Sequence, residues 1–380
     1  SSTHEFGKVG WSFYNPVRLI FGIDGLNVLP ELIMGRRVLL VTTPGFTRRG
    51  VTDRVRTLVE PYLAAIVDTI GPNPELDDLE GIAYGLHDIR AEAIVAVGGG
   101  SVIDTAKVIS AILSREELSL RNYLENDIGE LHGTAIPVIA VPTTAGTGSE
   151  VTPFATVWDS VSEKKYSLSG PQLFPEVALL DPSMTVSLPR DMTIMTGLDA
   201  ISQGFEAIWN RNATPVTTIY ATEALRIALS TLEQLAMDLD NVRLRAEMLR
   251  ASAFAGLAIS NTRTALAHSM SYPITLHYGV PHGLACGFTL PAILRFNSEV
   301  DDGRLHELAI ALGMNSVNGL HLHMTQFLER LGVQGMLENY VGCVEELEEL
   351  VPEMLTPGRS DNNVRRIGWR DLMKILDESK

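Results

Sequence analysis

Short runs of aliphatic and β-branched residues recur along the first half of the chain, and stretches with helical spacing lie between them. The runs cover residues 38–43, 64–68, 93–97 and 138–141, and the helical stretches lie near 48–60, 76–90 and 101–113. Strands that alternate with helices pair in parallel, through right-handed crossovers. The pattern therefore predicts an α/β domain on a doubly wound, mostly parallel sheet. A hairpin is expected at 154–158 and 165–168, and a last strand at 177–180.

The second half of the chain shows helical spacing of apolar residues almost throughout. Its Gly and Pro residues concentrate at the ends of the predicted helices. These helices are expected at 192–210, 217–238, 242–259, 264–272 and 284–296, with further helices toward the end of the chain. Because 380 residues are too many for one compact core, we predict two domains. The first, over 1–188, binds a dinucleotide, and the second, over 189–380, is all-α.

The charge balance restricts the partners of the chain. Its formal net charge is −16, which disfavours nucleic acid and anionic membranes because both need a positive surface. A small anionic substrate stays compatible, since it needs only a local basic pocket. No apolar run reaches the ~18–20 residues that span a bilayer, and no secretory signal is visible. Cys286 and Cys343 form no Cys-x-x-Cys pair, so we expect a cytoplasmic protein in which both thiols are bystanders.

A glycine-rich junction follows the run at 93–97 and opens the next helix, with the sequence Gly-Gly-Gly-Ser-Val-Ile-Asp-Thr-Ala-Lys over 98–107. Glycines there let the backbone approach a pyrophosphate, and the helix N-terminus offers free N–H donors and a positive dipole end. The spacing differs from G-x-G-x-x-G, so the usual Rossmann fingerprint is absent. We predict phosphate binding rather than a plain tight turn, by Gly99, Gly100, Ser101 and Asp104.

A second polar loop, Pro-Thr-Thr-Ala-Gly-Thr-Gly-Ser-Glu over 142–150, follows the run at 138–141. Hydroxyl side chains can hydrogen-bond a sugar, an amide or a phosphate. Contacts to the dinucleotide are therefore expected from Thr143, Thr144, Thr147 and Ser149, the alternative being a purely structural loop. Asn73, in a Gly-Pro-Asn-Pro turn, is expected at the edge of the same cleft, although a plain turn explains it nearly as well.

The end of the first strong strand bears on the choice of nicotinamide. An acidic residue at such a strand tip often holds a ribose 2′-hydroxyl, but this tip carries Thr43, with Arg48 and Arg49 shortly after it. A neutral tip with nearby cations tolerates a 2′-phosphate. We therefore predict that NADP(H) is used, alone or alongside NAD(H); the alternative is that both arginines are solvated helix charges.

Four candidate metal ligands lie in the second half of the chain. Asp199 and Gln203 are spaced i, i+4 and share a helix face. His268 and His282 lie fourteen residues apart on an apolar, helix-like segment, and His282 is in a Pro-His-Gly turn. Such groups can close a cage around a divalent ion, although the amide of Gln203 is a weak ligand. The alternative is a site that has lost its metal and binds substrate directly.

Together these motifs resemble those of the iron-dependent (group III) alcohol dehydrogenase family, in its order and at its spacing, over almost the whole chain. The resemblance implies a dehydroquinate synthase-like fold, an active site in the cleft between the domains, and a dimer or larger assembly. It implies that the metal, Fe²⁺ or else Zn²⁺ or Mn²⁺, binds Asp199, Gln203, His268 and His282. It also implies that Lys165 lies near the nicotinamide.

This sequence departs from the usual pattern of the family at several positions. Gln203 stands where the family usually has His, Tyr272 where many members have another His, and Thr43 where Asp is frequent. The sequences around His268 and Asp199 resemble the phosphonoacetaldehyde reductase branch, which makes 2-hydroxyethylphosphonate.

The resemblance implies that the chain is an NAD(P)H-dependent enzyme. Its expected reaction is the reduction of a small aldehyde, neutral or anionic, to a primary alcohol. We expect metal-assisted hydride transfer, with His277 or Tyr272 relaying the proton through water. Arg263 is the candidate for binding a phosphonate, and Arg211 is a second one. Three alternatives stay open: a generic medium-chain or polyol dehydrogenase of the same family, a lyase on the dehydroquinate synthase scaffold, and a non-catalytic ligand-binding protein.

Overall fold

The computed structural model describes residues 10–115, 119–125 and 134–380. Its contacts divide the chain into two compact units. Among the described residues, the first unit comprises Asn15–Thr144 and Ser149–Thr185, and the second comprises residues 10–14, Ala145–Gly148 and Val186–Lys380. The segment Ala145–Gly148, which connects two strands of the first unit, therefore belongs to the second unit. The hydrophobic pattern of the sequence does not reveal this.

The first unit is built on a six-stranded sheet in which every neighbouring pair is parallel, with the order β1-β8-β5-β4-β2-β3. Its strands are β1 (Arg18–Phe21), β2 (Val38–Val41), β3 (Leu63–Val67), β4 (Ala93–Gly98), β5 (Val138–Pro142) and β8 (Val177–Leu180). The doubly wound fold class is confirmed. The predicted hairpin is also present, as the antiparallel pair β6 (Phe154–Asp159) and β7 (Lys164–Ser169).

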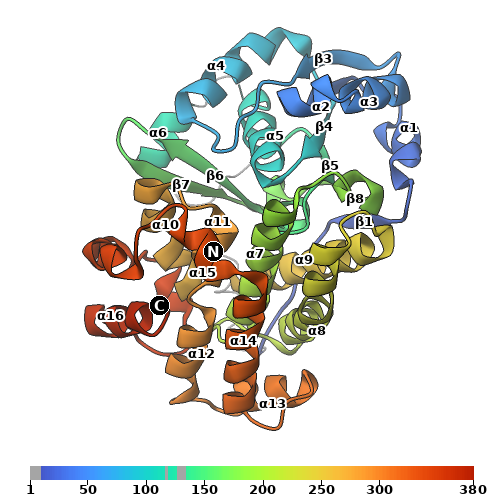
Figure 1. The fold of residues 1–380 in the computed structure, drawn as a ribbon. Helices are drawn as coiled ribbons and strands as arrows, with labels where there is room; N and C mark the ends of the chain where they lie inside the picture. Colours follow the sequence, from blue (N-terminus) through green and yellow to red (C-terminus); the bar gives the residue numbers. More distant parts are fainter. Residues whose placement is uncertain (1–9, 116–118, 126–133) are drawn as a thin grey trace. The chain divides into compact units, whose positions relative to one another are not determined.

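Alternate residues of β2, β4 and β5 fill two separate cores, one on either face of the sheet. Figure 1 shows the strands with helices packed around them. Val38 and Leu40 join one core, and Leu39 and Val41 join the other. The first core is covered by η1 (Gly25–Val28), α1 (Leu29–Ile33) and α3 (Val51–Val59), and the second by α4 (Leu76–Leu86) and α5 (Gly100–Leu113). Burial on both faces explains why the strands are continuous hydrophobic runs.

The remaining elements of the first unit are short. They are α2 (Pro44–Arg48), α6 (Leu120–Glu125), η2 (His87–Ile89), η3 (Ser149–Val151), η4 (Pro171–Leu173) and η5 (Pro182–Thr185). A buried lysine links α5 to the hairpin, since Lys107 Nζ donates to the carbonyl oxygens of Thr152 and Phe154 at 2.8 Å each. Glu150 is buried beside it, and its Oε1 has no hydrogen-bond partner among the described residues.

Glu150 makes the stability of the protein depend on pH. Burial raises the pKa of its carboxyl group from 4.5 to about 7, against the opposing attraction of Lys107. Since the folded-state pKa is the higher one, this group's contribution to stability is full below pH 4.5 and is lost as pH rises through 7. Between pH 5 and pH 8, the free energy of unfolding of Glu150→Gln should rise relative to the wild type by roughly 2 kcal/mol. Urea unfolding at several pH values checks this, and parallel pH profiles for the two proteins would refute it.

The second unit is helical. Its helices are α7 (Arg190–Ile208), α8 (Pro215–Met237), α9 (Val242–Thr262), α10 (Leu266–Tyr278), α11 (His282–Gly287), α12 (Leu290–Ser298), α13 (Arg304–Ala311), α14 (Val317–Leu331), α15 (Val333–Glu338) and α16 (Trp369–Asp377), with 3₁₀ segments η6 (Val344–Glu353) and η7 (Ser360–Asn362). The predicted helix at 264–272 continues to Tyr278 with Pro273 inside it. The predicted helix at 284–296 is wrong, since two helices, α11 and α12, occupy that stretch.

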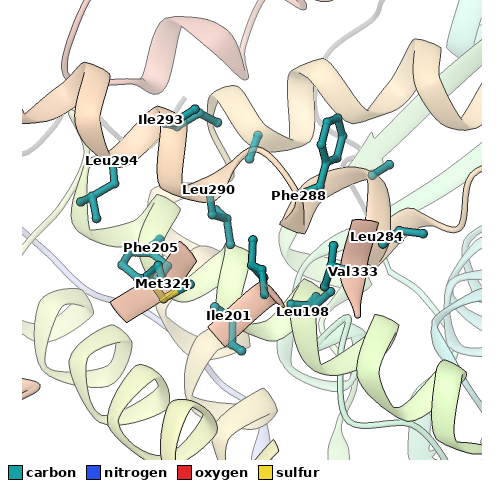
Figure 2. Packing of buried hydrophobic residues seen from close by; sticks show 14 of the residues in the cluster. Leu198, Ile201, Phe205, Leu284, Phe288, Leu290, Ile293, Leu294, Met324 and Val333 are labelled. Carbon is teal, nitrogen blue, oxygen red and sulfur yellow. The ribbon is translucent and has the colours of Figure 1, made fainter. Parts of the chain in front are cut away.

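Helix α7 is the core element of this unit and is buried along most of its length. Figure 2 shows Leu198, Ile201 and Phe205 of α7 in one apolar cluster with side chains of α11, α12, α14 and α15. Glycines allow the close contacts: a Cβ on Gly204 would lie 2.9 Å from Leu225 Cγ of α8, and one on Gly283 would lie 1.8 Å from the carbonyl oxygen of Met195. The start of α11 is therefore pressed onto the backbone of α7.

None of the helices in the described part of the chain combines the length and apolar character that crossing a membrane requires.

Candidate functional site

The two loops predicted to bind a dinucleotide lie side by side at the carboxyl end of the sheet. Gly98, the last residue of β4, pairs with Pro142 of β5, and Thr143 N donates to Gly98 O at 3.0 Å. A Cβ on Gly99 would lie 3.3 Å from Thr144 Cγ2. The carboxyl edge of a parallel sheet is where such folds bind nucleotides, so the first unit has a suitable surface there.

The N-terminus of α5 is open to an anion. Gly99 is its N-cap residue, and no side chain caps the helix. Gly98 is needed for packing, since a Cβ there would lie 2.5 Å from Val102 Cγ2. Gly100 and Ser101 form the first turn, where the free N–H groups and the dipole favour a phosphate. The predicted contacts of Gly99, Gly100 and Ser101 therefore stay a prediction with suitable geometry.

Other predicted nucleotide contacts have structural partners. Asp104 accepts hydrogen bonds from Ser149 Oγ at 2.6 Å and Thr156 N at 3.0 Å, so this carboxylate ties α5 to the polar loop and to β6. Thr43 caps α2, with its Oγ1 accepting from Phe46 N at 3.4 Å. Asn73 is exposed, and the Lys165 ammonium lies 5.4 Å from the centre of the Trp158 ring.

Thr147 belongs to the second unit, whereas Thr143, Thr144 and Ser149 belong to the first. Its segment packs closely there, since a Cβ on Gly146 would lie 2.7 Å from Thr196 O and one on Gly148 2.7 Å from Gly256 Cα. The carbonyl oxygen of Thr147 accepts a hydrogen bond from Gln203 Nε2 at 2.8 Å. The backbone of the loop thus borders the predicted metal ligands.

Four potential metal donors converge in the second unit. They are Asp199 of α7, His268 of α10, and His282 and Cys286 of α11, with donor atoms that all lie within 4.8 Å of one another. The two histidines are on separate helices, because α10 ends at Tyr278 and Gly279 turns the chain with φ 69°. The expectation of one helix-like segment is therefore wrong.

Sequence reasoning missed Cys286 and treated it as a bystander. The available signal was the i, i+4 spacing from His282, which places both side chains on one face of a helix. The signal was hidden because nothing in the local pattern shows that α11 begins at His282. Gln203 donates from Nε2 to Thr147 O at 2.8 Å and Asp199 Oδ1 at 3.4 Å, and its role as a metal ligand stays a prediction. Its Oε1 is buried and has no hydrogen-bond partner among the described residues.

Glu206 determines how His268 faces the cluster. This fully buried carboxylate accepts from the backbone N–H of Ala265 at 3.0 Å and of His268 at 3.1 Å, and its Oε2 lies 2.6 Å from His268 Nδ1. A proton on Nδ1 leaves the Nε2 lone pair directed at Asp199 Oδ1, 3.2 Å away. A second proton on Nε2 can bridge these two atoms, and a divalent metal can take the place of that proton, so the donor set fits a metal.

The four groups of the cluster shift one another's pKa values. Burial raises the pKa of Asp199, but His282 and His268 outweigh it and hold the pKa far below its usual value. Burial lowers the pKa of His282, but Cys286 and Asp199 raise it to about 10. Burial raises the pKa of the Cys286 thiol, yet the two imidazoles lower it to about 7. Metal binding requires neutral imidazoles and a thiolate, so a bound cation would take the place of these protons.

Glu206→Gln tests the orienting bond to His268. An amide presents an NH₂ group to N–H donors and carries no charge, so the imidazole should lose its fixed direction. We expect metal affinity to fall about 10–100-fold, the usual effect of removing such an orienting group. Competition with a chelator measures it. Glu223→Gln, on the surface of α8, is the matched control and should retain wild-type affinity; equal affinities for both variants would contradict the role of Glu206.

The residues predicted to relay a proton or to bind an anion form hydrogen bonds with groups outside the cluster of four donors. His277 Nε2 lies 3.0 Å from Glu353 Oε1, and His277 is not one of the four donors. The hydroxyl of Tyr272, one helical turn after His268, accepts from Arg359 Nε at 3.3 Å.

Arg263 ends α9 with φ 63°, and its carbonyl accepts from Asn210 Nδ2 at 3.1 Å. Arg211 Nε donates to Asn363 O at 3.0 Å. Arg359, which sequence reasoning did not select, is a cation in hydrogen-bond contact with Tyr272.

Comparison with known proteins decides the family. The model of iron-containing alcohol dehydrogenase matches residues 16–182, and the C-terminal model of the Fe-containing alcohol dehydrogenase family matches residues 193–379. The chain belongs to the iron-containing alcohol dehydrogenase family. It is an oxidoreductase of the alcohol dehydrogenase or aldehyde reductase type, as predicted.

Its relatives include enzymes acting on aldehydes with an acidic group and on simple alcohols. Phosphonoacetaldehyde reductase of Streptomyces viridochromogenes is 34% identical, over 90% of this chain and 89% of the relative. Long-chain-alcohol dehydrogenase 1 of Geobacillus thermodenitrificans is 30% identical, over 87% and 80%. The crystal structure of sulfoacetaldehyde reductase from Bifidobacterium kashiwanohense in complex with NAD⁺ matches with a TM-score of 0.88 at 28% identity, over 96% of this chain and 97% of that one. The predicted cofactor classes, a nicotinamide dinucleotide and a divalent metal, are confirmed at the level of the family.

Proposed function

We propose that this dehydrogenase reduces phosphonoacetaldehyde to 2-hydroxyethylphosphonate with a reduced nicotinamide dinucleotide. The observation that carries the proposal is the similarity to phosphonoacetaldehyde reductase over 90% of the chain. The structural match to sulfoacetaldehyde reductase points the same way, since both substrates are short aldehydes that end in an anionic oxygen-rich group. Within the second unit, the Arg359 guanidinium beside Tyr272 offers charge-assisted hydrogen bonds to such a group.

The residues of the second unit would position the aldehyde. A divalent metal held by this cluster supplies Lewis-acid polarisation of a carbonyl oxygen, and the nicotinamide supplies the hydride. Glu206 keeps the Nε2 lone pair of His268 directed at the cluster, and Gln203 orients Asp199 from the other side. His277 and Tyr272 remain the proposed proton donors for the product alkoxide; the Nε2 bond to Glu353 leaves His277 Nδ1 for exchange with water.

The residues near the end of β2 favour NADP(H). A Cβ on Gly45 would lie 3.8 Å from Arg49 Nη2 and 3.9 Å from Arg48 Nη2, so both guanidinium groups lie close to this turn. Two cations at a strand tip suit a 2′-phosphate. The Asp68 carboxylate accepts from Thr47 Oγ1 of the same turn at 2.7 Å. The proposal is that NADPH is preferred and NADH is accepted.

A reductase screen tests the function. The purified enzyme, supplied with Fe²⁺, Zn²⁺ or Mn²⁺, is assayed with NADPH and NADH against phosphonoacetaldehyde, sulfoacetaldehyde and propanal. We expect kcat/KM for phosphonoacetaldehyde to exceed that for propanal at least tenfold, because a paired anion contributes ~1.5–3 kcal/mol. Equal values would favour the generic dehydrogenase. Product formation without net oxidation of the nicotinamide would favour the lyase, and no turnover on any aldehyde the binding protein.

Arg359→Ala tests the anion contact separately. Losing a charge-assisted bond should raise KM for phosphonoacetaldehyde about 10–100-fold and leave kcat/KM for propanal within about twofold. Steady-state kinetics on both substrates check this. Arg366→Ala, at an exposed position of the same segment, is the matched control and should change neither value. If Arg263→Ala shows the selective effect and Arg359→Ala does not, the anion binds at the position expected from sequence.

A further inference from the structure

Cys286 lies among the potential metal donors. Its side chain is fully buried, and its Sγ lies 3.7 Å from His282 Nε2. His282 and Cys286 are one turn apart and share a face of α11. The adjacent face, which carries Gly283 and Gly287, packs closely on α7, since Cβ atoms there would lie 1.8 Å from Met195 O and 3.0 Å from Leu198 Cβ. This packing keeps α11 beside α7, and the thiol sulfur lies within 4.8 Å of the donor oxygen of Asp199.

Three of the separations between donor atoms are close to the edges of a zinc tetrahedron. Zinc binds N and O at about 2.0–2.2 Å and S at about 2.3 Å, so neighbouring ligand atoms lie about 3.3–3.7 Å apart. Asp199 Oδ1 lies 3.2 Å from His268 Nε2 and 3.4 Å from His282 Nε2, and Cys286 Sγ lies 3.7 Å from His282 Nε2. All four donor atoms lie within 4.8 Å of one another, so the four groups can surround one ion.

The amide of Gln203 forms hydrogen bonds through its nitrogen. Its NH₂ group donates to Thr147 O at 2.8 Å and Asp199 Oδ1 at 3.4 Å. Turning the amide over would place its oxygen against two other oxygens, so the hydrogen-bond network assigns the nitrogen to that side. The side chain therefore acts as a donor that orients Asp199. The imidazole expected at position 203 is replaced by an amide, while a thiol is present on the opposite helix.

We propose that Cys286 is the fourth protein ligand of the metal, so that Asp199, His268, His282 and Cys286 form a site selective for Zn²⁺ over Fe²⁺. A thiolate and two imidazoles are softer than an all-oxygen and nitrogen set, and such ligands suit Zn²⁺. The carboxylate and the thiolate also neutralise the charge of the ion. Four protein donors remain compatible with catalysis, since zinc can expand to five ligands. The proposal rests only on the part of the proposed function that places a divalent metal here, not on the substrate.

Cobalt substitution tests the ligand directly. Wild-type protein loaded with Co²⁺ should show the intense near-ultraviolet charge-transfer band of a cobalt–thiolate bond, together with visible bands of tetrahedral cobalt. Cys286→Ser should lose the near-ultraviolet band. Cys343→Ser, which changes the exposed second cysteine, is the matched control and should keep it. X-ray absorption of the wild-type zinc form should show one sulfur at about 2.3 Å.

The wild-type measurements decide the matter even if the Cys286 variant fails to fold. Metal uptake without a thiolate band or a zinc–sulfur distance would overturn the role of Cys286 and favour Gln203 Oε1 as the ligand. Failure of the wild type to take up Co²⁺ or Zn²⁺ at all would instead overturn the divalent-metal part of the proposed function. In a competition experiment, the preference of the wild type for Zn²⁺ over Fe²⁺ should exceed that of Cys286→Ser at least tenfold; equal preferences would also count against the proposal.

Discussion

Replacing Asp199 with alanine is expected to lower kcat/KM for aldehyde reduction about 1000-fold and to abolish stoichiometric metal binding. The Oδ1 atom of Asp199 contacts His268, His282 and Gln203. The substitution therefore removes a carboxylate that connects side chains of α7, α10 and α11. It also removes the carboxylate that lies between the two imidazoles, and His282 then keeps Cys286 beside it. Lewis-acid polarisation contributes several kcal/mol, and about 1.4 kcal/mol corresponds to a factor of ten in rate.

Metal analysis and steady-state kinetics of the same preparation check this result. Asp191→Ala is the matched control, because Asp191 lies in the first turn of α7, where it is exposed and pairs with Arg190. The control should keep its metal and its activity. An Asp199→Ala protein that retains one metal ion per chain with wild-type activity would show that the cluster is not the metal centre.

Gly283→Ala is expected to destabilise the protein by about 3 kcal/mol, at the upper end of the range for overpacking. Two effects of opposite sign compete. Alanine favours a helix by ~1 kcal/mol over glycine, but its Cβ would lie 1.8 Å from Met195 O and 2.7 Å from Met195 C. Because these are backbone atoms of α7, no side-chain rotation relieves the clash, and α11 must move away. The movement carries His282 from Asp199, so metal affinity should fall as well.

Chemical denaturation measures the stability of this variant. Gly335→Ala is the control, since Gly335 lies in α15 and nothing surrounds the position of its Cβ within 4 Å. There the helix propensity acts alone, and the variant should be more stable than the wild type by up to about 1 kcal/mol. Similar gains in stability at both positions would mean that α11 does not pack on α7 as described.

The architecture of the first unit was readable from local patterns. Val38–Val41 and Ala93–Gly98 are continuous apolar runs because they are buried on both faces of a parallel sheet. The hairpin was equally visible, since Phe154–Asp159 alternates between buried and half-buried residues. Strand ends were less exact: the run at 38–43 leaves the sheet after Val41, where Thr42 Oγ1 instead donates to Val97 O at 2.7 Å.

The candidate site was only partly readable. Asp199, His268 and His282 were chosen for their residue types and motifs, and the structure brings all three together. Glu206 was missed because a lone glutamate in an apolar helix carries no local signal, and Cys286 because its spacing from His282 has meaning only once α11 is known to begin there. Their roles depend on which helix faces which, and that depends on contacts between residues dozens of positions apart.

The amino-acid sequence by itself determined the secondary elements of both units, the parallel sheet and the family, because hydrophobic periodicity and short motifs are properties of neighbouring residues. The tertiary structure alone decided which donors meet. In the folded protein α11 packs on α7 at Gly283, the amide of Gln203 donates to Thr147 O, and the Cys286 thiol lies beside the His282 imidazole. Close packing between distant segments sets these positions to within a fraction of an ångström, and no local pattern in the chain encodes them.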